Sequence, residues 1–156
     1  RIASAVSRTG RVADARFLRV AGAGRAVAAI HDDGAAGGTH LFVLEGRGER
    51  FRVTGRSALD ADGFRDARWT QEAVDLDSDG YHEVLCTGVL ARGTTDARRY
   101  VLYSPRTRQT YTLSVAPNTR GARQIKWSPN ALTRAAHPFR AALQHRASMA
   151  LPSRIL

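Results

Sequence analysis

The sequence predicts a single, mostly β domain over residues 1–156, with two four-stranded antiparallel units and a C-terminal helix. Short β-prone segments recur along the chain at a nearly constant spacing, and an acidic loop at 75–83 leads directly into one of them. Apolar residues beyond Ser128 recur instead at helical spacing. The chain has 156 residues, which is long enough to bury one hydrophobic core.

The two-unit prediction depends on an internal repeat. Chance can produce any one match, but four matches in the same order and at similar offsets indicate a repeated supersecondary unit. Differences of one or two residues in loop length account for the small drift in offset. The matches are 25–28 with 82–85 (offset 57), 41–44 with 100–103 (offset 59), 51–53 with 111–113 (offset 60) and Trp69 with Trp127 (offset 58).

We place the first unit at residues 14–57 and the second at residues 66–116. Each unit contains four runs rich in β-branched, aromatic and aliphatic residues, separated by turn-forming residues. The predicted strands lie near 16–20, 25–31, 39–45, 49–54, 69–75, 82–89, 98–103 and 109–115.

The loop at 75–83 is a candidate metal site. It has acidic residues at relative positions 1, 3, 5 and 9, and Gly80 at position 6 permits the sharp turn that returns the chain toward the ion. Close carboxylates repel one another unless a cation or water separates them. The alternative is a solvated acidic turn, because Asp, Ser and Gly form turns in any case. The predicted Ca²⁺ ligands are Asp75, Asp77, Asp79, Glu83 and the backbone carbonyl of Tyr81.

The loop is not an EF-hand, since position 12 is Cys86 and a β-prone run, not a helix, follows Glu83. An acidic loop of this spacing ahead of a strand resembles the FG-GAP and VCBS-type repeats of integrin-like propellers. The resemblance implies calcium held for structure, blades of antiparallel strands and an extracellular or cell-surface location. The equivalent stretch of the first unit, 18–26, lacks the acids, so we expect one site.

Residues 123–156 begin like a third unit and then change character. The run 123–127 is predicted to be a strand equivalent to the one around Trp69, and Ser128-Pro129 favours a helix start. Pro138 should kink or split the basic amphipathic helix. We expect the helix to cover the open side of the sheets, with binding to a membrane surface or a partner as the alternative. Its apolar stripe is Leu132, Ala136, Phe139, Leu143, Ala147 and Ala150.

The charge is unevenly distributed. Residues 97–156 contain ten arginines and Lys126 but no acid, whereas residues 1–96 contain thirteen arginines and fourteen acids. This imbalance predicts contact with an anionic surface: an acidic glycan, a lipid head group, nucleic acid or the acidic face of another subunit. Nucleic acid is the less favoured ligand, because no zinc-finger, helix-turn-helix or RNA-recognition motif accompanies the charge. The candidate contact residues are Arg106, Arg108, Arg120, Arg123 and Arg134.

The favoured function is a calcium-stabilised extracellular structural or adhesion module. Two blade-like units cannot close a propeller, so unpaired edges predict a homo-oligomer or larger assembly. The runner-up is a polyanion-binding module. The sequence has no nucleophile elbow, phosphate-binding loop or zinc-protease motif, which leaves a hydrolase with a calcium-stabilised scaffold as a minor alternative. No apolar run reaches 18 residues, so no transmembrane segment is expected, and a chain that opens at Arg1 is expected to be a mature secreted protein or a fragment.

Overall fold

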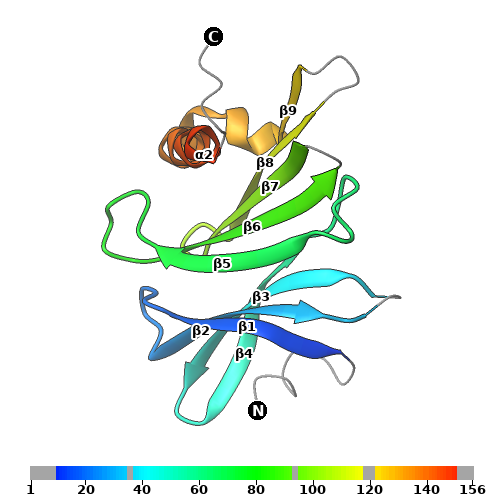
Figure 1. The fold of residues 1–156 in the computed structure, drawn as a ribbon. Helices are drawn as coiled ribbons and strands as arrows, with labels where there is room; N and C mark the ends of the chain where they lie inside the picture. Colours follow the sequence, from blue (N-terminus) through cyan, green and yellow to red (C-terminus); the bar gives the residue numbers. More distant parts are fainter. Residues whose placement is uncertain (1–9, 35–36, 93–94, 118–121, 151–156) are drawn as a thin grey trace.

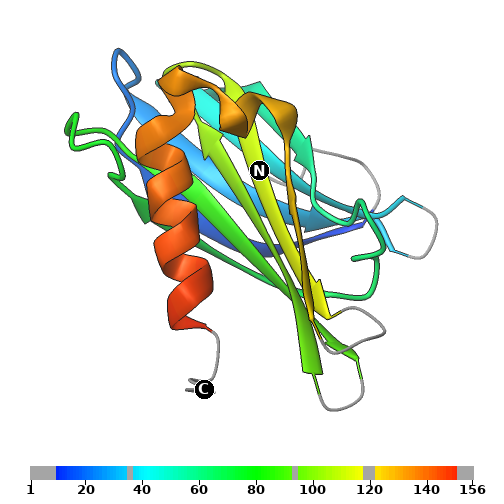
Figure 2. The same cartoon turned by 90° about the horizontal axis from the view of Figure 1, so that it is seen from above.

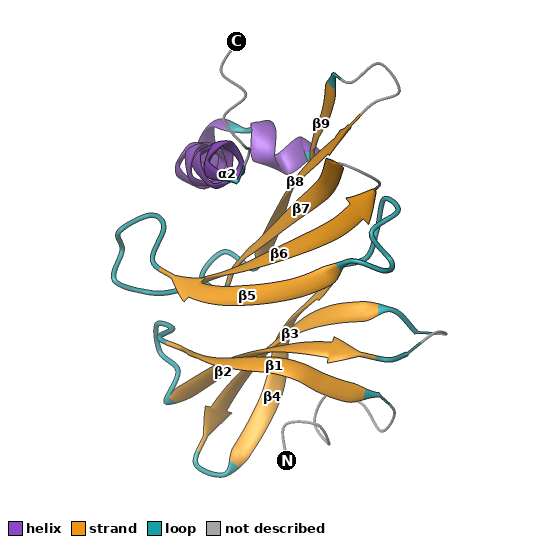
Figure 3. Cartoon of the chain, viewed as in Figure 1, coloured by secondary structure: helices purple, strands orange, loops and turns teal. Residues whose placement is uncertain are grey.

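The computed structural model describes residues 10–34, 37–92, 95–117 and 122–150. These residues form two antiparallel sheets and a C-terminal helix, which confirms the predicted mostly β architecture (Figure 1 and Figure 3). The first sheet contains β1 (Arg11–Leu18), β2 (Arg25–Asp32), β3 (Thr39–Arg47) and β4 (Arg50–Ala58), in that order. The second contains β5 (Arg68–Val74), β6 (Glu83–Arg92), β7 (Thr95–Ser104), β8 (Gln109–Pro117) and β9 (Arg123–Trp127), in that order.

The second sheet differs from the prediction in having five strands, not four. The run assigned to a separate third unit is β9, which pairs antiparallel with β8 so that Leu113 lies opposite Trp127 and Val115 opposite Ile125. This pairing extends the apolar outer face of β8 onto the added strand. The prediction of four strands was therefore wrong, because the third unit supplies one strand to the sheet before it.

One hydrophobic core lies between the two sheets, which stack face to face, and a second lies between the second sheet and the helical segment (Figure 1 and Figure 2). Strand periodicity turns alternate residues inward, so Ile30 and Val43 of the first sheet meet residues such as Cys86 of the second. Burial raises the pKa of the Cys86 thiol, as expected of an inert core cysteine. Polar contacts also cross this layer: the hydroxyls of Ser57 and Thr110 lie 2.8 Å apart.

The two sheets approach each other closely at Gly55. A Cβ atom at this position would lie 2.3 Å from the hydroxyl oxygen of Tyr103, which belongs to the opposite sheet. The Tyr103 hydroxyl also donates a hydrogen bond of 3.3 Å to the carbonyl of Thr54. The absence of a side chain at Gly55 therefore allows a tyrosine of the second sheet to reach the backbone of β4.

The helical segment covers the outer face of the second sheet, as predicted. Two short 3-10 turns, η1 (Pro129–Leu132) and η2 (Arg134–Ala136), precede α2 (His137–Met149). Pro138 thus falls in the first turn of α2, where its missing N–H costs no hydrogen bond, and the predicted helix is split at this point. Phe139 stacks on Tyr111 of β8 with ring centroids 5.2 Å apart. Leu132 is the exception in the predicted stripe, since it is 60% exposed.

None of the helices in the described part of the chain has the length and hydropathy that a membrane span requires.

Candidate metal centre

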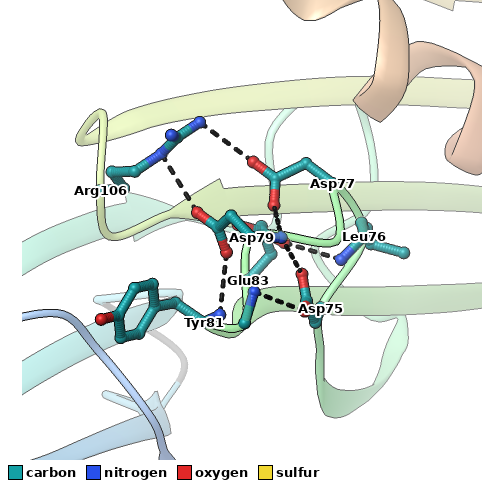
Figure 4. A network of polar contacts seen from close by, with 8 residues as sticks. Asp75, Leu76, Asp77, Asp79, Tyr81, Glu83 and Arg106 are labelled. Atoms are coloured by element: carbon teal, nitrogen blue, oxygen red, sulfur yellow. Dashed lines mark hydrogen bonds and ion pairs between the residues drawn. The ribbon is translucent and has the colours of Figure 1, made fainter.

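The acidic loop connects β5 to β6, and the sheet register brings its two ends together. Val74 is paired with Glu83, so the loop leaves the sheet and returns to it at neighbouring positions. The backbone N–H groups of Asp79 and Gly80 donate to the two oxygens of Asp75, at 3.1 and 2.8 Å. Gly80 has a φ of 87°, a conformation that favours glycine. The loop is therefore closed on its own first carboxylate (Figure 4).

Three of the four predicted carboxylate ligands converge. Asp75, Asp77 and Glu83 each offer one oxygen, and these oxygens lie within 4.8 Å of one another. Two oxygens bound to the same Ca²⁺ at 2.3–2.6 Å can be at most about 5 Å apart, so the spacing is compatible with a shared ion. Glu83 forms the floor of the site: it is only 1% exposed, and one of its oxygens accepts a 2.8 Å hydrogen bond from the backbone N–H of Leu76.

The electrostatics of this triad are unfavourable without a cation. The pKa of Glu83 is raised to about 7, chiefly by burial and also by the negative charges of the three aspartates, against the lowering effect of the Leu76 N–H. Burial is also the main cause of the raised pKa of Asp77, with the neighbouring Asp79 contributing. A divalent ion placed among these oxygens would remove the repulsion that disfavours the ionised forms.

Asp79 does not join the triad. One of its oxygens accepts a 2.8 Å hydrogen bond from the backbone N–H of Tyr81, and the other lies 3.3 Å from Nε of Arg106. Arg106 also pairs with the outer oxygen of Asp77 at 3.1 Å. The Tyr81 side chain points away from the carboxylates (Figure 4), which leaves the backbone carbonyl as the group of Tyr81 that could reach an ion.

A connection between the loop and the first sheet was not predicted. Arg19, just after β1, donates its backbone N–H to Nδ1 of His82 at 3.0 Å, and its carbonyl accepts the His82 N–H at 2.8 Å. The Arg19 side chain also donates to the carbonyl of Gly80. The partners are more than sixty residues apart, so no local sequence pattern indicates this contact. The order of the loop is thereby coupled to the packing of the two units.

Four of the five arginines predicted to contact a polyanion lie in the described part of the chain, on three different elements. Arg106 is a counter-ion of the acidic loop, and Arg108 is exposed in the same turn. Arg123 begins β9, while Arg134 is exposed in η2. Arg120 lies outside the described residues.

Other basic residues after position 97 also meet acids of the same chain. Asp62 accepts from Arg99 at 2.7 Å and from Lys126 at 2.8 Å, and Glu72 pairs with Arg146. These pairs lower the pKa of Asp62, chiefly through the hydrogen bonds from Lys126 and then Arg99. The acidic and basic parts of the sequence therefore neutralise one another partly within one molecule.

Comparison with known proteins gives no match to a family model, to a curated protein or to a solved structure. The fold and the loop together define a mostly β protein of two stacked sheets with a candidate metal centre between β5 and β6.

Proposed function

We propose that this protein is a calcium-stabilised structural or adhesion module that works outside the cell and assembles with copies of itself or with other subunits. The observation that carries the proposal is the convergence of Asp75, Asp77 and Glu83 within 4.8 Å in a loop that feeds a strand. Because the triad includes a buried glutamate whose ionised form is disfavoured unless a cation is bound, ion binding is expected to contribute directly to folding stability.

The FG-GAP or VCBS-type interpretation remains part of this proposal. It is supported by two consecutive antiparallel sheets, blade-like in their connectivity, whose first strands β1 and β5 lie next to each other (Figure 1). We infer that the ion is a structural staple, since the loop is fixed both to β6 and, through Arg19, to the first sheet. A calcium affinity in the millimolar to submillimolar range, typical of extracellular modules, suits a loop in which Arg106 already neutralises part of the charge.

The test is thermal unfolding of wild type and Asp77→Ala in excess calcium and in excess chelator. A ligand that binds only the folded state at about 100 times its Kd stabilises by about 2.7 kcal/mol. For a chain of this length that corresponds to a rise in Tm of about 5–10 °C. Asp77→Ala should lack this rise, and Asp66→Ala, which removes an exposed acid outside the loop, should retain it. A wild-type Tm that does not change between calcium and chelator would refute the proposal.

The alternative proposal is a polyanion-binding module, and the exposed Arg108, Arg123 and Arg134 favour it. Binding of this kind weakens with salt, because screening at physiological ionic strength acts beyond about 8 Å. Heparin is a suitable probe of acidic glycan binding. Reversal of the three arginines to Glu should abolish retention on heparin at low salt, while the same reversal at Arg11, Arg47 and Arg50, which are exposed on the first sheet, should not. Equal retention of both variants and wild type would exclude this alternative.

A further inference from the structure

The strand β9 forms an exposed edge of the second sheet. Among the described residues it pairs only with β8, and four of its five residues are exposed (Figure 1). Ile125, at its centre, is 61% exposed although it is a large β-branched residue. An edge strand presents unpaired backbone donors and acceptors, which act as a template for another strand unless something blocks them.

The hydrogen-bond phase of β9 shows which residues face the open edge. Ser128 donates its backbone N–H to the carbonyl of Thr112, and in an antiparallel ladder every second residue points toward the same neighbour. Lys126 and Gln124 therefore face β8, whereas the backbone groups of Arg123, Ile125 and Trp127 point outward. Pro117, which has no N–H, lies opposite Arg123, in agreement with this phase.

A charged side chain often blocks the pairing of an edge strand, but in β9 the lysine is held by an ion pair within the chain. Arg123 at the start of the strand and Lys126 near its end are the charges that could block strand addition, but the Lys126 ammonium group lies 2.8 Å from Asp62 in the loop before β5. The same Asp62 also holds Arg99, so the lysine is directed toward the inner face of the sheet and not across the edge. The outer face of the strand is apolar at Ile125 and Trp127.

From this geometry we propose that β9 pairs with β9 of a second copy of the chain, antiparallel and centred on Ile125. In that register Ile125 lies opposite Ile125 of the second copy, and Arg123 lies opposite Trp127. Each of these pairs has outward backbone groups on both sides, so each can exchange two N–H···O bonds. No like charges are opposed: Lys126 faces Gln124, and the Arg123 guanidinium can lie on the Trp127 indole. The strand is thus complementary to itself.

An apolar groove extends the proposed interface beyond the strand. It lies between β8, β9 and the C-terminal half of α2, and it reaches the same open edge. The side chains of Ile125 and Trp127 form one wall, and Ala147 of α2 forms part of the other. Two-fold pairing of β9 joins the grooves of the two copies and buries both Ile125 side chains. This additional buried area matters because a strand of five residues alone buries less surface than a stable interface requires. Because none of these residues belongs to the acidic loop, the dimer does not depend on calcium.

Sedimentation velocity over about 1–200 μM tests the proposal, a range that brackets a weak standard-size interface. Wild type should change from monomer to dimer, in chelator as well as in calcium. Ile125→Lys and Ile125→Glu should each be monomeric, because each places two like charges at the two-fold axis. An equimolar mixture of the two variants should form a dimer at low salt, since residue 125 then meets its opposite charge. The matched control is Phe17→Lys, which adds a charge at an exposed apolar residue of the first sheet and should dimerise like wild type.

Three outcomes would overturn the proposal. Wild type that stays monomeric throughout the range excludes the dimer. Charged variants that associate like wild type place the contact elsewhere. Variants that are monomeric both alone and in the mixture, with melting curves that show them to be folded, exclude a register centred on Ile125. A dimer that forms without calcium leaves the metal proposal to be judged separately by its own melting test.

Discussion

Replacing Glu83 by Gln should stabilise the calcium-free protein while removing its response to calcium. The pKa of Glu83 is raised from 4.5 to about 7 in the folded chain, mainly by burial, so the folded state holds this proton more tightly than the unfolded state. The stability contributed by the protonated group is fully present below pH 4.5 and is lost as the pH rises to about 7. Each pKa unit corresponds to about 1.4 kcal/mol, so at pH 8 the ionised carboxylate lowers the free energy of unfolding of the protein in chelator by about 3 kcal/mol.

The Gln side chain has nearly the same shape, and its amide oxygen can still accept the Leu76 N–H, but it cannot ionise. In chelator at pH 8 the variant should therefore melt about 5–10 °C above wild type, and the difference should disappear toward pH 4.5. Excess calcium stabilises wild type alone by about 2.7 kcal/mol at 100 times Kd, which should close the gap.

The assay is calorimetric melting across pH 4.5–8 in calcium and in chelator, with Glu49→Gln, at an exposed turn position, as the control. If Glu83→Gln melts at or below the wild-type temperature in chelator at pH 8, the ionised Glu83 carboxylate does not destabilise the calcium-free protein. If it melts higher but keeps the full calcium response, Glu83 is not a ligand.

Two further predictions concern the ion pairs and the helix. Asp62→Asn should lower the free energy of unfolding by about 1–2 kcal/mol at pH 7, because the buried Arg99 (5% exposed) loses its carboxylate partner. The loss stays this small because Asp62 itself is partly exposed, so that solvent screens the ion pair. The pKa of Asp62 is lowered, so its contribution is lost as the pH falls below 3.8, and a destabilisation that is equally large in acid would contradict the assignment. Leu143→Ala should cost about 2–5 kcal/mol in urea unfolding, because Leu143 is fully buried between α2 and the second sheet, whereas Leu132→Ala, at a 60% exposed site, should stay within about 0.5 kcal/mol. Similar costs for the two leucines would mean that α2 does not pack as described.

Local pattern was sufficient to predict most of the strands, because each is short and lies between turn residues. The repeat located β2, β3, β6, β7 and β8 closely, but it placed the first strand near 16–20 where β1 is Arg11–Leu18. The partner of β9 was not predictable from the repeat. In the repeat, β9 corresponds to the strand around Trp69 and so suggests the start of a new unit. It joins the second sheet instead, because its apolar residues continue the apolar outer face of β8.

The candidate site shows the same limit. The spacing of Asp75, Asp77 and Glu83 indicates a shared ligand because alternate residues of one loop project to one side. Arg106 pairs with Asp77, 29 residues earlier in the sequence, and also with Asp79. Lys126 pairs with Asp62, which is 64 residues away. Such contacts depend on how the turn between β7 and β8 and the strand β9 lie in the folded sheet. Sequence alone thus assigned to an external partner some of the basic residues that bind acids of their own chain.

Equilibrium dialysis against radioactive calcium measures whether the loop binds one calcium ion. At pH 8 and low millimolar free calcium, we expect one ion bound per wild-type chain and none bound by Asp77→Ala or Glu83→Gln. Wild type without bound calcium, or variants that still bind one equivalent, would contradict this expectation.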